Sequence, residues 1–311
     1  MSHNITIEGG TSVRLPTAGK YCDRDIVITA TGSGGGGDNV ARSIVDKTIT
    51  AYSDNEVETI RAYIFYNSTS LVSVNAPSVT DIDTYAFSGC TALASVNLVG
   101  AKTIGSYAFN KCTALTSFNG ENTTSLSSYA FTGCSALTEV NLPKVTSVGQ
   151  YAFNGTAIKH LSLPSYKTMT TGAFRGSTFE TCDFPIVTNI SNNGFRAQGY
   201  IKSVTFPKVT LTASEAMRNC TALTYVDLPL CTSFGTYTFY DCSSLETLIL
   251  RAGSVCKMGN VNVLTNTKIA AGTGFVYVPK SLESTYKSAT NWSTYAAQIR
   301  AIEDYPEITG G

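Results

Sequence analysis

An internal repeat of 22 residues constrains the fold more than any other feature of this 311-residue chain. The triplet Tyr-Ala-Phe recurs with its phenylalanine at Phe87, Phe109, Phe131 and Phe153, at a spacing of 22 residues each time. Degenerate copies extend this column to Phe65, Phe174, Phe195, Met217 and Phe239. The period predicts stacked coils, because one coil cannot bury its own apolar side chains whereas neighbouring coils form a continuous core.

Further apolar columns keep register with the phenylalanine column. An apolar residue follows six positions later, a second three positions after that, and a third two positions later again, as in Leu137, Val140 and Leu142. This L-x-x-L-x-L pattern is the strand signature of leucine-rich repeats. We expect one short strand per coil, paired in parallel with its neighbours at about 4.8 Å. The Tyr-Ala-Phe segment predicts a single turn or a 3₁₀ segment.

The combined columns resemble the BspA-like leucine-rich repeats of bacterial and protist surface proteins. The shared motif is L-x-x-L-x-L-P, then I-G-x-Y-A-F, then x-x-C-x-x-L, and it covers residues 44 to 250. The resemblance implies a β-rich solenoid, here of about nine coils with parallel strands. Because that family includes adhesins and host-protein binders, it also implies a binding role.

The chain outside the repeat suggests four regions. Residues 1–31 are expected to form a small β module that anchors or docks on a partner, since so few residues cannot sustain a core alone. Residues 32–38 form a Gly-rich segment, which is either a native flexible linker, a simple tether or a cloning linker. Residues 39–250 form the predicted solenoid. Residues 251–311 are predicted to form a C-terminal cap with a strand at 275–278 and short helices.

Both ends carry a second resemblance. The stretch from Ile5 to Thr29 looks like N-terminal modules of tail and other virion-associated proteins from phages of gut Firmicutes. The segments Tyr277–Lys280 and Tyr286–Trp292 look like the C-terminal segment common on BspA-like proteins of that origin. The N-terminus lacks a signal-peptide pattern, and no stretch approaches the roughly 18 apolar residues of a membrane span.

These features favour a virion protein that is made in the host cytoplasm. Its N-terminal module would bind other virion proteins or self-associate into a homo-oligomer, and its solenoid would adhere to a host surface protein or glycan. The alternatives are a BspA-like adhesin at the bacterial cell surface and a structural spacer of the virion. A formal net charge of zero gives no support for binding nucleic acid or inserting into a membrane.

The sequence offers no catalytic constellation. His3 and His160 are the only histidines, no phosphate-binding or nucleophile-elbow motif occurs, and the carboxylates are scattered. No CxxC pair suggests a zinc site. We therefore expect no enzyme activity, cofactor or metal.

Two residue columns allow more than one interpretation. Cys90, Cys112 and Cys134 share one column, which predicts buried free thiols acting as small hydrophobes rather than disulfides, because in-register side chains point the same way. The tyrosines that precede the core phenylalanines could form a sugar-stacking ladder. Packing between coils is the preferred interpretation.

Alternation along each strand defines the candidate ligand-binding face, because the residues that flank the central apolar position point outward. In the first coils this outward set is a nearly uniform Ser/Asn ladder from Ser73 to Asn119. It then becomes varied, as recognition would require. The candidate residues are Glu139, Asn141, His160, Ser162, Thr181, Asp183, Ser203, Thr205, Tyr225 and Asp227.

Overall fold

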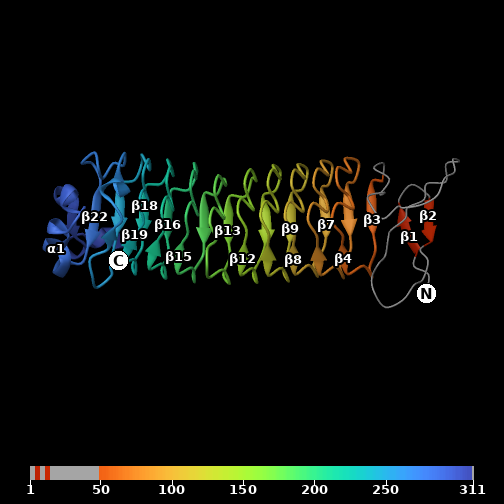
Figure 1. The fold of residues 1–311 in the computed structure, drawn as a ribbon, viewed down its shortest axis with the longest axis horizontal. Coiled ribbons are helices and arrows are strands. Elements are labelled where there is room, and N and C mark those ends of the chain that lie inside the picture. Colours follow the sequence, from red (N-terminus) through yellow and green to blue (C-terminus); the bar gives the residue numbers. More distant parts are fainter. Residues whose placement is uncertain (1–3, 8–10, 15–48, 310–311) are drawn as a thin grey trace. The chain divides into compact units, whose positions relative to one another are not determined.

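The computed structural model describes residues 4–7, 11–14 and 49–309. The chain divides into two compact units, each of which is built from solenoid coils (Figure 1). Unit 1 comprises residues 1–143 and 155–157, and unit 2 comprises residues 144–154 and 158–311. Each unit is described separately below.

Each coil contains a short strand, which in the repeated coils is formed by the L-x-x-L-x-L segment. In unit 1 these strands are β3 (Ala51–Ser53), β5 (Ser73–Asn75), β7 (Ser95–Asn97), β9 (Ser117–Asn119) and β11 (Glu139–Asn141). In unit 2 they are β13 (His160–Ser162), β14 (Thr181–Asp183), β16 (Ser203–Thr205), β18 (Tyr225–Asp227), β20 (Thr247–Ile249) and β22 (Phe275–Val278). Strands that share a sheet pair in parallel and in register, as in Ser73 opposite Ser95 and Ser203 opposite Tyr225. The paired sets are β3-β5-β7 and β9-β11 in unit 1, and β13-β14 and β16-β18-β20-β22 in unit 2.

The described part of the chain therefore contains eleven turns of solenoid rather than the nine predicted. The prediction counted the phenylalanine column, which begins at Phe65. Strand β3 precedes that column, and β22 follows its last recognised member at Phe239. Both coils keep the fold although they depart from the repeated sequence, because backbone pairing requires only that a strand lie alongside its neighbour.

Nine of the coils in the described residues also carry a second strand, where the sequence predicted only one per coil. In the coil of β13 this position forms only an isolated bridge, from Thr168 to Asn189. The two-residue strands in unit 1 are β4 (Thr59–Ile60), β6 (Asp81–Ile82), β8 (Thr103–Ile104) and β10 (Ser125–Leu126). In unit 2 they are β12 (Ser147–Val148), β15 (Asn189–Ile190), β17 (Leu211–Thr212), β19 (Ser233–Phe234) and β21 (Lys257–Met258). Their second residue points inward and is buried, which accounts for the apolar column five positions before the phenylalanines.

The core of each unit lies between its two ladders. The phenylalanines are fully buried, and in unit 1 they form a regular stack in which Phe87–Phe109 and Phe109–Phe131 ring centroids are each 5.2 Å apart. The spacing follows directly from one ring per coil at the strand-to-strand distance. Such stacked, buried rings contribute both apolar burial and aromatic contact to stability.

The Tyr-Ala-Phe segment forms hydrogen-bonded turns, not a helix. Its tyrosines adopt a left-handed backbone conformation, with φ of 58° at both Tyr85 and Tyr107 and 61° at Tyr129. A left-handed residue in every coil prevents the segment from continuing as a helix. The rings are half-buried and stack face to face, with centroids 4.7 Å apart for Tyr85–Tyr107 and 4.6 Å for Tyr107–Tyr129. Neighbouring rings thus cover the faces that a sugar would need, in agreement with packing between coils.

The coil after Phe239 contains an insertion. Leu264 takes the place of the core phenylalanine 25 residues after Phe239, because the Phe239 amide donates to the Val263 carbonyl as Phe195 does to Ala216. This segment includes the 3₁₀ helix η1 (Val261–Leu264). The parallel pairing then continues to β22, whose Phe275 lies opposite Thr247.

Short helical segments follow β22. They are η2 (Lys280–Leu282), α1 (Glu283–Ser288), η3 (Ser293–Gln298), η4 (Ile302–Asp304) and η5 (Pro306–Thr309). The strand β23 (Ile299–Ala301) lies between η3 and η4 and pairs in parallel with β22. Two aromatic residues anchor this region to the solenoid: the Trp292 indole donates to the Cys256 carbonyl at 2.6 Å, and the Tyr286 hydroxyl accepts from the Cys256 amide at 2.8 Å. Both side chains are fully buried.

The N-terminal strands β1 (Asn4–Ile7) and β2 (Thr11–Arg14) pair antiparallel, with Ile7 opposite Thr11. The rest of the predicted β module and the Gly-rich linker at 32–38 lie outside the described residues. No helix in the described residues is long and apolar enough to span a membrane.

Candidate ligand-binding face

The outward strand positions of unit 1 bind one another. The Asn97 amide donates to Asn75 Oδ1 at 2.7 Å, and the Asn141 amide donates to Asn119 Oδ1 at 2.9 Å. At the start of the ladder, Asn75 donates to Ser53 Oγ at 3.2 Å. These amides stand one coil apart on parallel strands, so they are spaced for side-chain hydrogen bonds. The uniform ladder thus uses part of its hydrogen-bonding capacity within the solenoid.

Two of the ten candidate residues, Glu139 and Asn141, lie next to the end of this ladder. Both lie on β11 in unit 1 and both are exposed. Asn141 already donates to Asn119. The other eight candidates lie in unit 2, so the set does not form one surface within a single unit.

The outward positions of β13, β14 and β16 in unit 2 are varied and accessible. His160, Thr181, Asp183, Ser203 and Thr205 are exposed, and Ser162 is half-buried. His160 Nδ1 lies 2.6 Å from Thr181 Oγ1, and the Ser162 hydroxyl donates to Asp183 at 3.3 Å. The second imidazole nitrogen of His160 on β13 takes no part in these two contacts. Neither do the hydroxyls of Ser203 and Thr205 on β16.

Charged and aromatic side chains border this part of the face. Lys159, the residue before β13, forms a 2.8 Å ion pair with Glu180, the residue before β14. The Lys159 ammonium also lies 5.1 Å from the centre of the Tyr200 ring, which is 52% exposed. Hydrogen bonding and charge attraction between the pair raise the pKa of Lys159 and lower that of Glu180. As an exposed pair it contributes little to stability and can rearrange around a ligand.

The end of the candidate face differs from the prediction. Asp227 occupies an outward position on β18, yet it is only 6% exposed. Arg251 Nη1 donates to both of its carboxylate oxygens, at 2.7 and 2.6 Å. Asp227 therefore has a structural role as the buried partner of an arginine, and it is withdrawn from the exposed candidate set.

Tyr225 is also less available than its strand position suggested. It packs beside a cluster of Ile249, Tyr277 and Ile302, to which the C-terminal residues Tyr305 and Ile308 contribute. Burial, together with the nearby Asp227 carboxylate, raises the pKa of Tyr225. Ile302, Tyr305 and Ile308 of the C-terminal segment thus pack against the outward side chains Ile249 of β20 and Tyr277 of β22. Alternation on β18 alone could not reveal a covering segment 80 residues further along the sequence.

Sequence comparison identifies the family. A model described as "BspA type leucine rich repeat region (6 copies)" matches residues 58–181 and 167–294, which together span most of the chain. The chain belongs to the BspA-type leucine-rich-repeat family.

Comparison with solved structures finds other leucine-rich-repeat proteins at low identity. A leucine-rich cell surface protein of Faecalibacterium prausnitzii is 21% identical, with 88% of this chain and 95% of that chain covered and a TM-score of 0.38. A leucine-rich-repeat protein of T. pallidum is 24% identical over 63% of this chain and 78% of that chain, with a TM-score of 0.40. One from Bacteroides ovatus is 16% identical over 76% and 91%, with a TM-score of 0.41. Comparison with curated proteins gives no match.

One column of this BspA-type repeat has a role that the sequence interpretation missed. The position three residues after each core phenylalanine is buried, and it always carries a hydrogen-bond donor. Its members are Ser68, Cys90, Cys112, Cys134, Thr156, Ser177, Gln198, Cys220, Cys242 and Thr267. The Cys112 thiol, for example, donates to the Phe87 carbonyl of the preceding coil at 3.1 Å.

The cysteines are therefore free and buried as expected, but they act as donors rather than as inert hydrophobes. Burial raises the pKa of Cys90 to about 12, which keeps its thiol protonated and able to donate. Alternation of Cys with Ser, Thr and Gln was the available signal, because these side chains share a donor and differ in hydrophobicity. No group of three or more metal-ligating side chains occurs among the described residues.

Proposed function

We propose that this BspA-type protein is a non-catalytic binding protein that recognises a macromolecular partner through the strand face of unit 2. The observation that carries the proposal is the set of exposed, chemically varied side chains on β13, β14 and β16. His160, Asp183 and Ser203 offer an imidazole, a carboxylate and a hydroxyl on three adjacent strands. Strands β13 and β14 pair in parallel and β14 lies beside β16, so the solenoid holds these groups at fixed separations without requiring a rearrangement on binding.

Unit 1 supports a second role, that of a spacer. Its outward asparagines are hydrogen-bonded to one another, and its aromatic rings are stacked on one another. A ligand would have to replace these contacts before gaining its own. We propose that unit 1 mainly adds length, while the C-terminal segments after β22 cap the solenoid by covering its apolar end.

A protein that recognises a partner through its strand face can act as an adhesin on the surface of a particle or a cell. We propose that the protein is virion-associated, that its N-terminal residues bind other virion proteins, and that its solenoid meets a host surface protein or glycan. The resemblance of both chain ends to phage proteins supports this setting. A bacterial cell-surface adhesin is the alternative, and it would use the same strand face.

Cell binding tests the proposed face. Fluorescently labelled full-length chain is incubated with intact gut Firmicutes, and bound fluorescence is measured by flow cytometry. The double variant Thr181→Ala/Asp183→Ala should lose most of the binding, whereas Ser117→Ala in unit 1 should retain it. Equal binding by all three proteins would contradict the choice of face.

Mass spectrometry of purified particles tests the setting separately. Peptides of this protein in washed virions support virion association. Its absence from virions, together with labelling at the surface of cells that carry no phage, would favour the bacterial adhesin.

A further inference from the structure

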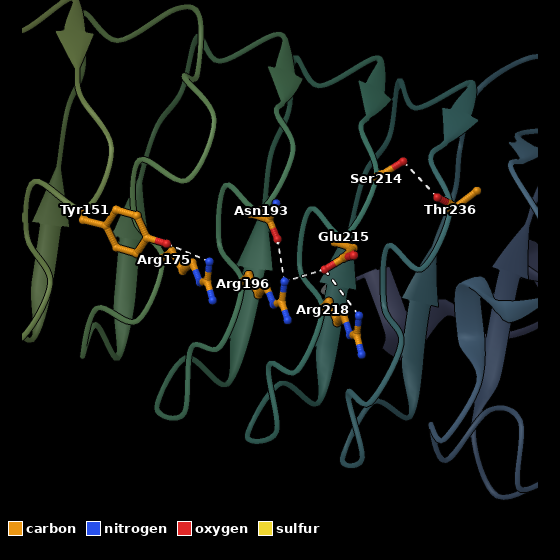
Figure 2. Close-up of polar contacts among 8 residues, drawn as sticks. All are labelled: Tyr151, Arg175, Asn193, Arg196, Ser214, Glu215, Arg218 and Thr236. Carbon is orange, nitrogen blue, oxygen red and sulfur yellow. Dashed lines mark hydrogen bonds and ion pairs between the residues drawn. The ribbon is translucent and has the colours of Figure 1, made fainter. Parts of the chain in front are cut away.

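Three arginines occupy one column on the turn side of unit 2. Arg175, Arg196 and Arg218 each follow the core residue of successive coils, Phe174, Phe195 and Met217. The same column in unit 1 carries uncharged residues such as Ser88 and Asn110. Figure 2 shows the three arginine side chains in a row, one from each coil. Their spacing is therefore about one strand separation, roughly 4.8 Å.

Neighbouring side chains hold the guanidinium groups in place. Arg175 Nη1 donates to the Tyr151 hydroxyl at 2.7 Å, and its guanidinium carbon lies 5.5 Å from the centre of that ring. The Arg218 guanidinium lies 5.0 Å from the centre of the Tyr240 ring. Contacts of this kind restrict a flexible side chain before any ligand binds, which lowers the entropic cost of binding.

Glu215 is the carboxylate that pairs with the row. Its Oε2 lies 2.7 Å from Arg196 Nη1 and 3.4 Å from Arg218 Nη1 (Figure 2). Arg175 has no carboxylate partner among the described residues. Three positive charges and one negative charge leave an excess of two positive charges on the row. Asp241, on the coil after Arg218, forms no ion pair with the row and accepts a hydrogen bond from the Asn266 amide at 2.8 Å.

Donor capacity remains on each arginine. The contacts of Arg175, Arg196 and Arg218 described above, and the 3.1 Å bond from Arg196 to Asn193, all use Nη1. A guanidinium carries five N–H donors, so Nη2 and Nε of each are left for a ligand. The side chains of Arg196 and Arg218 are 29% and 31% exposed, which places them at the surface but partly packed.

We propose that Arg175, Arg196 and Arg218 form a second interaction surface, which binds an acidic segment of a partner protein. The charge excess requires an anionic partner, and planar guanidinium forks match carboxylate groups in a bidentate manner. Tyrosines flank the row, with Tyr151 at one end and Tyr237 and Tyr240 at the other. Arginine and tyrosine together are the residues that most often dominate protein–protein interfaces, which favours a protein over a sulfated glycan.

This surface is separate from the strand face, since its residues lie on the turn segments of the same coils. It would engage its partner whether or not the strand face binds a ligand.

Binding of a short fluorescent poly-glutamate peptide to the full-length chain tests the proposal. Fluorescence anisotropy should show binding that weakens as salt increases. Arg175→Gln and Arg218→Gln should each reduce affinity about tenfold, the loss expected for one charge-assisted contact. Glu215→Gln should raise affinity about threefold, because it removes the competing carboxylate. Loss of folding cannot produce that increase.

Lys111→Gln is the matched control, because Lys111 is exposed in a turn of unit 1 and the change removes one positive charge. It should leave affinity unchanged. An equal loss with Lys111→Gln would reduce the effect to general charge attraction and overturn the proposal. Absence of peptide binding, or arginine-dependent binding of dextran sulfate in preference to the peptide, would also overturn it.

Discussion

The two units of this protein use one repeat in opposite ways. In unit 1 the 22-residue period is strict, so identical side chains of neighbouring coils contact one another. Phenylalanine stacks on phenylalanine, tyrosine stacks on tyrosine, and asparagine forms a hydrogen bond with asparagine. In unit 2 two successive core spacings shrink to 21 residues, and Phe153–Phe174 ring centroids move to 6.4 Å.

The irregular stretch of unit 2 is filled by other aromatics. Phe179 and Phe184 pack on Phe174, with Phe174–Phe184 centroids 5.0 Å apart. Its outward strand positions and turn column also change from one coil to the next. The comparison shows that strict repetition consumes side chains in contacts between coils, whereas divergence of the repeat leaves different groups at the surface for a ligand.

The largest expected contrast concerns the core stacks. Phe109→Ala should destabilise the protein by about 4–5 kcal/mol, near the top of the range for buried phenylalanine, because the regular coils on both sides cannot collapse into the cavity. Phe195→Ala should cost about 3 kcal/mol, because Phe184 and Phe206 can repack around it. Urea unfolding followed by circular dichroism measures both. A larger loss for Phe195→Ala would contradict this view of the two cores.

The buried donor column should respond differently in the two units. Cys112→Ala removes the thiol that donates to the Phe87 carbonyl and should cost about 1–2 kcal/mol, while Cys112→Thr retains a donor and should cost less. In unit 2 the buried Ser177 hydroxyl has no hydrogen-bond partner, so Ser177→Ala should be neutral or stabilising. Thermal unfolding of the three variants measures these changes in stability. A stabilising Cys112→Ala would show that the thiols serve only as hydrophobes.

The left-handed turn column provides a third contrast. Tyr107 accepts the strain of φ 58° while its ring stacks on both neighbours. Tyr107→Ala should cost about 1–2 kcal/mol, because the stacking is lost and the strain is kept. Asn193 in unit 2 occupies the same column with φ 56° and no stack, so Asn193→Ala should cost about 1 kcal/mol or less. If denaturant titrations show equal losses of unfolding free energy for the two variants, stacking of the Tyr107 ring does not contribute to stability.

The smallest expected effect is pH dependence at Asp81 in unit 1. Hydrogen bonds from Thr103, at 2.5 Å, and from Thr80 lower the pKa of this carboxyl below its ordinary value of 3.8. A lowered folded-state pKa means that the stabilisation is present above pH 3.8 and is lost as pH falls through the folded-state pKa. Asp81→Asn should therefore flatten the acid side of the stability profile slightly. Asn189, the equivalent position on β15, has no such charge to lose.

The repeat columns predicted most of the fold, since the period, the inward residues and the strand at 275–278 follow from the spacing of apolar side chains. The coil count was wrong because the terminal coils keep backbone pairing without the motif, as Leu264 shows. The second ladder was missed because a two-residue strand has no alternation to recognise.

The candidate site was predictable only in part. Strand alternation placed His160, Thr181 and Ser203 at the surface, where the structure has them. It also placed Asp227 there, because the pairing with Arg251 and the covering C-terminal segment depend on residues distant in sequence. The arginine column is visible in the sequence as a Phe-Arg pair at 174–175 and 195–196, but the third member follows Met217, which interrupts the pattern.

One pair of variants tests directly whether unit 2 presents the binding face and unit 1 does not. Ser203 and Ser117 offer a matched pair, since each is the exposed first residue of its strand. Ser203→Arg and Ser117→Arg would each place one bulky cation on the outward side, and binding to intact cells would be measured for both folded proteins. If unit 2 presents the binding face, Ser203→Arg abolishes binding and Ser117→Arg leaves it intact. Loss of binding with Ser117→Arg and not with Ser203→Arg would contradict it.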